Sequence, residues 1–290
     1  MAEQFRDRVA KYWLGGLRLA RRVWPGAAES SFRALLFHDI PDADIDSFAR
    51  LADYVQEKHG ILSPDQAEAV MRGEGARVPP GRTPCLLTFD DGFKSNLKAA
   101  REVLSRRGIR GLFFVCPGLI DLPESVRGQA VLENVLLGRR PPRPEGLELM
   151  TWDDLRELTA LGHAIGSHTL THRALPRLET AAMEEEVSRS SERIERRLGH
   201  RPRWFAYPFG DIDSIGSREL GIIRRSYRFC RSGIRGLNGP RTDSSAILAD
   251  AVDFRNSFEY QQLVLEGGLD WYYRGRRAAL GRKLADAGPA

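Results

Sequence analysis

The sequence predicts an α/β protein in which parallel strands alternate with helices. Two observations support this fold class. Short apolar runs recur along the chain, and most are followed by a segment in which apolar residues have helical spacing. The chain has 290 residues, 42% of them hydrophobic, which is enough to bury a sizeable core. Periodicity leaves two architectures open, an open doubly wound sheet and a closed barrel.

The elements are expected in a regular order. The run Arg33–His38 predicts a first strand, and a helix with apolar residues between Phe48 and Val55 follows it, ending near Gly60. Ser63-Pro64 is typical of a helix start, with a serine cap and a proline in the first turn. The remaining strands are expected at 85–90, 111–116, 163–167, 204–207 and 227–230, and the remaining helices at 95–107, 151–161, 179–198 and 214–225.

Three segments flank or interrupt this alternation. Residues 30–290 are expected to form a single catalytic domain, and residues 1–29 a basic segment before it. Within the domain we expect a helical insertion near 123–146 and a helical tail near 257–284. Within the insertion we expect a helix at about Val131–Leu137, before a Pro-Pro-Arg-Pro linker.

Charge and cysteine content exclude several classes of protein. The balance of 44 basic and 39 acidic residues is a mild excess, so a dedicated nucleic-acid binder is not expected. Most of the basic residues are arginines, and we attribute most surface arginines to the base composition of the genome. The three cysteines are far apart, which predicts neither a disulfide framework nor a zinc ribbon.

The segment from Phe5 to Trp24 has the pattern of a basic amphipathic helix, with aromatic and leucine residues among arginines. Such a helix either lies on an anionic membrane surface or packs on the flank of its own domain. No stretch is long and apolar enough to span a bilayer, and the first residues lack the pattern of a signal peptide. We therefore expect a cytoplasmic protein, peripheral on the inner membrane face if the helix binds lipid.

Two groups of polar residues point to chemistry. His168 and His172 are four residues apart, a spacing at which two imidazoles can reach one metal ion. Asp90 and Asp91 directly follow an apolar run, where buried carboxylates are costly unless they are paired or bound to a cation. One aspartate and two histidines leave open positions on a divalent ion, which suits catalysis, and the other aspartate is then free to act as a general base. Zinc is the expected ion, with Co²⁺ or Ni²⁺ as alternatives.

Three motifs carry a family resemblance. Thr88-Phe-Asp-Asp-Gly92, Ser167-His-Thr-Leu-Thr-His172 and Phe205-Ala-Tyr-Pro-Phe-Gly210 occur in that order. Together they resemble the polysaccharide deacetylase family, the NodB-homology domain of carbohydrate esterase family 4, over about Arg33 to Asp253. The resemblance implies a distorted (β/α) barrel and metal-dependent removal of N-acetyl groups, sometimes O-acetyl or N-formyl groups, from sugars. The barrel agrees with candidate side chains at the C-terminal ends of predicted strands.

Carried over to this chain, the resemblance assigns roles to the motif residues. It makes Asp91, His168 and His172 the metal ligands and Asp90 the general base. A backbone N–H near Phe209 would stabilise the oxyanion. The residues expected to form the sugar and oxyanion site are Tyr207, Pro208, Phe209, Gly210 and Asp211.

The sequence departs from the family pattern at two places. Many members have an arginine that contacts the base where this chain has Ala206, so we expect that contact to be missing. No histidine follows His200, although many members keep their general acid near the C-terminus. His38, at the end of the first strand, resembles the acid histidine of the branch that includes poly-N-acetylglucosamine deacetylases. Asp211 is a candidate to orient the His38 ring.

These predictions give a metal-dependent deacetylase that acts on an amino sugar in a bacterial polysaccharide or a lipid-linked glycan precursor. The alternatives are a catalytically weak carbohydrate-binding relative and a deformylase or O-deacetylase of the same fold. The expected partners are an acetylated glycan and, through residues 5–24, a membrane surface. Nucleic acid is not expected, and the sequence leaves the oligomeric state open.

Overall fold

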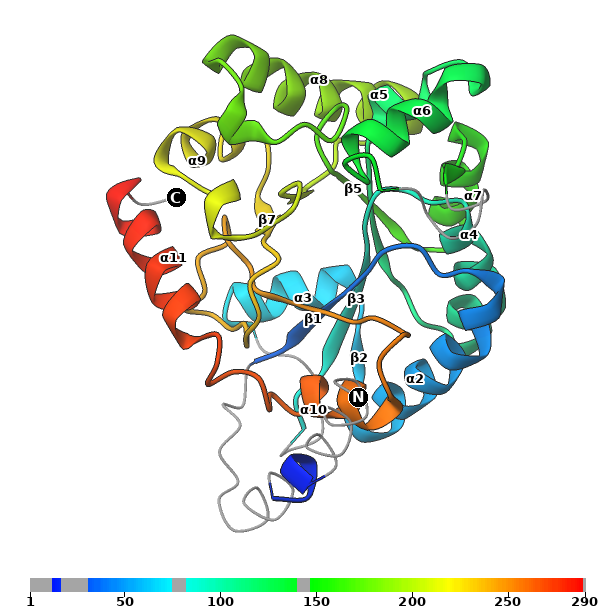
Figure 1. The fold of residues 1–290 in the computed structure, drawn as a ribbon, viewed down its shortest axis with the longest axis vertical. Coiled ribbons are helices and arrows are strands. Elements are labelled where there is room, and N and C mark those ends of the chain that lie inside the picture. The colour runs from blue at the N-terminus through cyan, green and yellow to red at the C-terminus, as the bar shows by residue number, and fades with distance from the viewer. Residues whose placement is uncertain (1–11, 17–30, 75–81, 140–146, 289–290) are drawn as a thin grey trace.

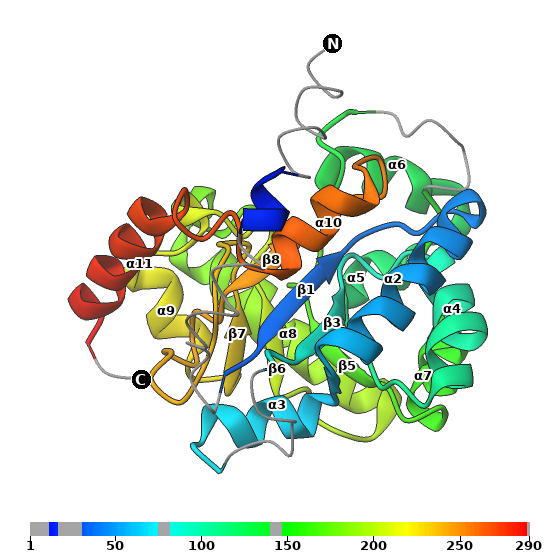
Figure 2. The same ribbon diagram turned by 90° about the horizontal axis from the view of Figure 1, so that it is seen from below.

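In the described residues, eight strands form one sheet, and every pairing between them is parallel. The computed structural model describes residues 12–16, 31–74, 82–139 and 147–288 (Figures 1 and 2). The strands are β1 (Arg33–Phe37), β2 (Ile61–Leu62), β3 (Cys85–Phe89), β4 (Leu112–Val115), β5 (Ala164–Ser167), β6 (Trp204–Ala206), β7 (Phe229–Arg231) and β8 (Ala249–Ala251). Their order is β7-β6-β5-β4-β3-β1-β8, with β2 also paired to β3.

The sheet curves into a barrel that is nearly closed. β8 pairs with β1, and the residues just before β8 reach β7 at the other end of the sheet through a bridge between Ile247 and Arg231. Two backbone hydrogen bonds of 2.7 Å, made by the amides of Ser232 and Ile247, reinforce this seam. The barrel predicted from the sequence is therefore confirmed, and the open sheet is excluded.

Helices cover the outside of the barrel (Figure 1). They are α2 (Ile45–Lys58), α3 (Pro64–Met71), α4 (Ser95–Ala99), α5 (Pro117–Ile120), α6 (Glu124–Asn134), α7 (Trp152–Ala160), α8 (Thr180–Leu198), α9 (Ser217–Ile223), α10 (Phe258–Leu265) and α11 (Arg274–Asp286). The single helix expected at 95–107 is α4 followed by a π turn and a 3₁₀ turn, which ends before Gly108. None of the helices in the described residues is both long and apolar enough to cross a membrane.

Local signals in the sequence set several helix starts. Ser63 caps α3 and forms a capping box with Gln66, and Thr151 does the same for α7 with Asp154. The acidic pair at 153–154 is thus part of a helix start.

Alternating strand residues build two cores, because successive side chains point to opposite faces. Leu36 of β1, Phe114 of β4 and Trp204 of β6 fill the barrel interior. Leu35 and Phe89 face outward and pack beneath α2, α4 and α7. The polar residues that follow the strands are left at the C-terminal mouth of the barrel.

Four parts of the chain differ from the sequence prediction or lie largely outside its test. The two-residue β2 and the Ala-Asp-Ala strand β8 were not predicted, since neither is an apolar run of strand length. In the insertion the helix starts earlier than expected, at Glu124. The predicted helix at 5–24 lies mostly outside the described residues, but residues 12–16 are helical and Leu14 is buried against Leu263 of α10.

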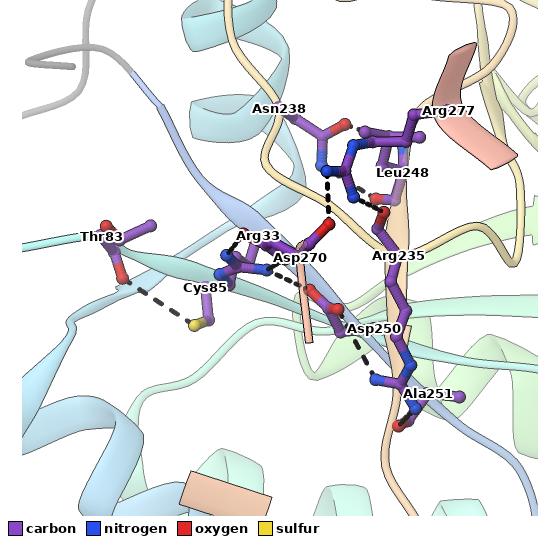
Figure 3. Close-up of polar contacts among 10 residues, drawn as sticks. All are labelled: Arg33, Thr83, Cys85, Arg235, Asn238, Leu248, Asp250, Ala251, Asp270 and Arg277. Carbon is purple, nitrogen blue, oxygen red and sulfur yellow. Dashed lines mark hydrogen bonds and ion pairs between the residues drawn. The ribbon is translucent and has the colours of Figure 1, made fainter. Parts of the chain in front are cut away.

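A buried ion network joins β1, β8 and the C-terminal segment (Figure 3). Arg33, which is 2% exposed, donates to Asp250 of β8 at 2.8 Å and to both carboxylate oxygens of Asp270. Arg277 of α11 donates to the carbonyl oxygens of Arg235 and Asp270 at 3.0 and 2.6 Å. The turn between α10 and α11 is therefore fixed to the first strand of the barrel.

Candidate functional site

The loops after β3 and β5 bring three metal-ligating side chains together at the mouth of the barrel. Asp91 follows β3, and His168 and His172 follow β5; all three are buried, and their ligand atoms lie within 4.8 Å of one another. The Oδ1 atom of Asp91 is 3.5 Å from Nε2 of His168 and 3.3 Å from Nε2 of His172. This arrangement has the donor types that a divalent transition-metal ion prefers.

Hydrogen bonds orient both imidazoles toward the cluster. Nδ1 of His168 lies 2.8 Å from the carbonyl oxygen of Ala206, and Nδ1 of His172 lies 3.0 Å from that of Asn134. A carbonyl oxygen can only accept, so each Nδ1 carries the proton and each Nε2 presents its lone pair. Burial lowers the pKa of His168 to about 3 and also lowers that of His172, which keeps both rings neutral. The contact between Asn134 and His172 was not predicted from the sequence.

The backbone at the site is held in an unusual conformation. Asp91, Thr169, His172 and Phe209 all have positive φ angles, between 63° and 69°. Leu137 is the one other non-glycine residue with positive φ in the described chain. Non-glycine residues in the left-handed region are strained and cluster at functional sites. The loops are thus shaped for the side chains that they present.

Arg231 holds the second aspartate, Asp90. Its guanidinium forms a buried ion pair with Oδ2 of Asp90 and also donates to the carbonyl oxygen of Ser232 at 3.0 Å. Arg231 on β7 pairs in register with Ala206 on β6, so the small alanine leaves room for the arginine of the next strand. The expectation that Asp90 lacks an arginine contact is therefore wrong. The sequence feature that could have indicated this contact is an arginine directly after the apolar residues 229–230.

The two adjacent carboxylates have different electrostatic environments. Burial opposes the charge of Asp90, but the positive charge of Arg231, with the nearby histidines, outweighs it and lowers the pKa of Asp90. Burial, together with the negative charge of Asp90, raises the pKa of Asp91 to about 7, and the positive charges of His38 and Arg231 oppose this only in part. Oδ1 of Asp91 is also a buried oxygen without a hydrogen-bond partner among the described residues. A cation among Asp91, His168 and His172 would satisfy that oxygen, so these residues fit a metal ion.

His38 directly follows β1 and is exposed at the mouth of the barrel. Its charge acts on both Asp90 and Asp91, which places the imidazole near the two carboxylates. The proposed acid and base thus come from neighbouring strands, since β1 pairs with β3.

The residues of the third motif divide between core and surface. Phe209 is 44% exposed, and its ring lies 4.9 Å from that of His172. Tyr207, expected to line the sugar site, is 1% exposed and donates to the carbonyl oxygen of Ser245 at 2.8 Å; it packs in the core against Phe205. That expectation is corrected, because the strand direction turns Tyr207 away from the mouth.

The rest of the motif shapes the loop. Pro208 is buried, and Gly210 has a φ of 59° and accepts a backbone hydrogen bond of 2.7 Å from Gly233. A side chain at Gly210 would collide with the backbone of Gly233. Asp211, expected to orient His38, instead accepts from the amide of Ile212 and pairs with Arg276 at 3.0 Å.

A pocket of about 460 Å³ opens beside the cluster. His172 and Phe209 form its end nearest the metal-ligating atoms. Its other walls come from α6, the loop after His172 and the loop after Phe209; the polar residues among them are Glu133, Asn134, Arg173, Arg177, Asp211, Asp213 and Ser214. The volume and the mixed polar and apolar lining suit a sugar residue.

Comparison with known sequences identifies a family and one curated relative. Residues 77–220 match the model of a family described as polysaccharide deacetylase. A curated protein of Bacillus subtilis (strain 168), uncharacterized protein YlxY, is 33% identical over 67 residues, which are 21% of this chain and 21% of that protein. The chain therefore matches about a fifth of the length of that relative.

Comparison with solved structures finds the same barrel in several deacetylases. The deacetylase PplD of Streptococcus pyogenes superposes with a TM-score of 0.64 at 16% identity, over 82% of this chain and 99% of that one. IcaB from Ammonifex degensii has a TM-score of 0.62 at 23% identity, over 82% and 97% of the two chains. A de-N-acetylase from Aggregatibacter actinomycetemcomitans has a TM-score of 0.61 at 17% identity, over 81% and 100%.

Proposed function

Since this chain belongs to the polysaccharide deacetylase family, we propose that it is a metal-dependent enzyme that removes the N-acetyl group from an amino sugar. The observation that carries the proposal is the convergence of Asp91, His168 and His172 on one point beside the ion-paired Asp90. The family are hydrolases of carbon–nitrogen bonds in carbohydrates, and this geometry supplies both a metal site and a base.

The residues that would hold the metal are Asp91, His168 and His172. A divalent ion there, Zn²⁺ by the donor set and Co²⁺ or Ni²⁺ as alternatives, supplies a Lewis acid that polarises the acetyl carbonyl and acidifies a water molecule. The carbonyl oxygens of Ala206 and Asn134 keep both imidazoles in the tautomer that can bind it.

The remaining steps belong to side chains of this chain. Asp90, kept ionised by Arg231, takes a proton from the attacking water at its carboxylate. His38 donates a proton to the leaving amine. The backbone N–H of Phe209 stabilises the oxyanion, and the exposed Phe209 ring packs against the sugar.

We propose a bacterial polysaccharide or a lipid-linked glycan precursor as the substrate. The open pocket beside His172 can take one sugar of a longer chain. A membrane-linked precursor fits the basic amphipathic pattern of residues 5–24, which suits the anionic surface of the inner membrane face. An O-acetyl or N-formyl group in the position of the N-acetyl group would contact the same catalytic and metal-binding residues.

Metal analysis combined with activity measurements tests the proposal. Purified protein exposed to Zn²⁺ and then dialysed should retain about one ion per chain, and His168→Ala and His172→Ala should each lose it. Asp90→Asn should keep the ion and lose turnover of N-acetylated oligosaccharides, since it removes the base and no ligand. His200→Ala, at the surface after α8, is the matched control and should keep both properties. Unchanged metal content in both ligand variants would refute the site.

Activity separates the proposed enzyme from a binding relative. Turnover by the wild-type protein that is lost in Asp90→Asn supports the deacetylase. Tight binding of the oligosaccharide without acetate release, at full metal occupancy, would support the carbohydrate-binding alternative.

A further inference from the structure

Four exposed aromatic side chains lie on two short segments of the surface. Tyr12 and Trp13 are 82% and 58% exposed, and Trp271 and Tyr272 are 71% and 76% exposed. In the described part of the chain, Phe209 at the catalytic mouth is the one other exposed aromatic residue. Large exposed aromatic groups on a folded surface indicate an interaction site.

The two segments are neighbours in space. Leu14 is buried in a small cluster with Leu263 of α10, and Leu269 packs against the same cluster. Leu269 precedes Trp271 by two positions. In both views, residues 12–16 lie beside α10 and the turn that follows it (Figures 1 and 2). The four aromatic residues thus belong to one surface.

The turn that carries Trp271 and Tyr272 is firmly held. Asp270, directly before them, is bonded to the buried Arg33, and its carbonyl oxygen accepts from Arg277 (Figure 3). Gly267 has a φ of 72°, and a side chain there would collide with the guanidinium of Arg33. The aromatic pair therefore projects from a fixed turn.

The charge around the aromatic pair is positive. The guanidinium of Arg274 lies 4.3 Å from the centre of the Trp271 ring, and no acidic side chain among the described residues pairs with it. α11 continues with four more basic residues and one acidic residue. Arg282 is also exposed. Aromatic rings beside arginines match the interface of an anionic bilayer, where rings lie at headgroup depth and guanidinium groups reach phosphates.

Helix α11 connects this surface with the loop that carries Asp211. Arg276, in the first turn of α11, forms a two-oxygen ion pair with Asp211. Asp211 lies two residues after Phe209, whose ring contacts His172. The aromatic turn itself is bonded to Arg33 at the start of β1, the end of that strand away from His38.

We propose that Tyr12, Trp13, Trp271 and Tyr272, with Arg274, form a membrane-docking surface that binds an anionic lipid bilayer. This surface would give the enzyme a membrane contact near its C-terminal helix, in addition to the proposed contact through residues 5–24. The biological purpose of the contact rests on the membrane-linked substrate of the proposed function. A sugar-stacking platform is less suited to this surface, because the Arg274 guanidinium covers one face of the Trp271 ring.

Vesicle co-sedimentation of the full chain tests the docking surface. Vesicles of phosphatidylcholine alone and of phosphatidylcholine with about one-third phosphatidylglycerol should be compared at low and high salt. We expect binding to the anionic vesicles, at least tenfold weaker for the double variant Trp271→Ala/Tyr272→Ala. Arg274→Gln should weaken binding about fivefold at low salt and less at high salt. Leu161→Ala, at the end of α7, removes an exposed apolar group elsewhere and should bind like wild type.

The same preparations distinguish the outcomes. Turnover of a soluble N-acetylated oligosaccharide should be unchanged in the double variant, so loss of vesicle binding is separate from any failure of the proposed enzyme. Equal binding of wild type and double variant to anionic vesicles, or no binding by either, overturns the docking surface. Binding of soluble glycan or self-association that depends on Trp271, without vesicle binding, also overturns it.

Discussion

The arginine that pairs with Asp90 comes from β7, because Ala206 on β6 leaves the neighbouring position open. Arg231 and Ala206 are partners in register, so the guanidinium reaches the same carboxylate from one strand further along the sheet. Motif spacing identified Asp90, Asp91, His168 and His172, since the two members of each pair, aspartates and histidines, lie within a few residues of each other in the chain. It could not identify Arg231, because its proximity to Asp90 depends on the order of strands in the sheet.

Replacing Arg231 should change the pH dependence of catalysis. Arg231 lowers the pKa of Asp90, so in Arg231→Gln burial acts with less opposition and the pKa rises. The base is then protonated at higher pH, and the acidic limb of the pH–rate profile should move upward. We expect turnover at neutral pH to fall by about a hundredfold, the usual scale for loss of a general base.

Two further variants control this result. Ala206→Arg combined with Arg231→Ala should recover part of the lost activity, because it returns a guanidinium to the neighbouring strand. Arg228→Gln, an exposed arginine just before β7, should behave as wild type. A wild-type pH profile in Arg231→Gln would show that the ion pair does not control the base.

His38→Ala should reduce turnover by about a hundredfold while leaving the bound metal in place. The imidazole follows β1 and acts electrostatically on both aspartates, yet it is not part of the cluster of ligand atoms. Metal analysis and steady-state rates on one preparation check both parts. Near-normal turnover would assign the acid to another group.

Helix α6 contributes to the site through its backbone. The carbonyl oxygen of Asn134, the last residue of α6, accepts from Nδ1 of His172, and the Asn134 side chain donates to the carbonyl oxygen of Thr171 at 2.9 Å. The sequence predicted a helical insertion here. It gave no sign of this contact, because a backbone carbonyl is present at every residue and only the tertiary structure selects one.

Proline at the end of α6 should weaken metal binding. Val135 donates its amide to Val131, and Val135→Pro removes that bond and forces Asn134 away from helical geometry. The carbonyl that orients His172 would move, so metal affinity should fall by about 10- to 100-fold. Ser125→Pro in the first turn, where proline is tolerated, is the control. Competition with a chromogenic chelator measures the affinity, and equal affinities would exclude the carbonyl as an orienting group.

The barrel as a whole was predicted from alternation and motifs, but its closure was not. Strands such as β3 and β4 are apolar runs bounded by glycine or proline and were predicted within a residue or two. Closure depends on the three-residue β8 and on pairing between Arg33 and Asp250, which are 217 positions apart. Neither a short strand nor a distant ion pair leaves a local pattern.

Breaking the buried ion network should destabilise the whole domain. Arg33→Met leaves Asp250 buried, at 1% exposure, without its strongest partner. We expect the free energy of unfolding to fall by about 3–5 kcal/mol in urea titrations. Arg255→Gln breaks an exposed pair with Asp253 and should cost less than about 1 kcal/mol. A loss in Arg33→Met as small as that of the control would mean that the network contributes little.

The same network orders events during protein synthesis. Arg33 lies in the first strand, and its partners at 250 and 270 are made more than two hundred residues later. Until then, either β1 has no partner strand on one side, or the guanidinium of Arg33 is buried in the forming core without its acidic partners. Contacts of such long sequence separation form late. In stalled ribosome complexes whose nascent chain has left the exit tunnel only up to residue 265, β1 should therefore be cut by protease. Protection of β1 should appear once the turn at 267–273 has also left the tunnel.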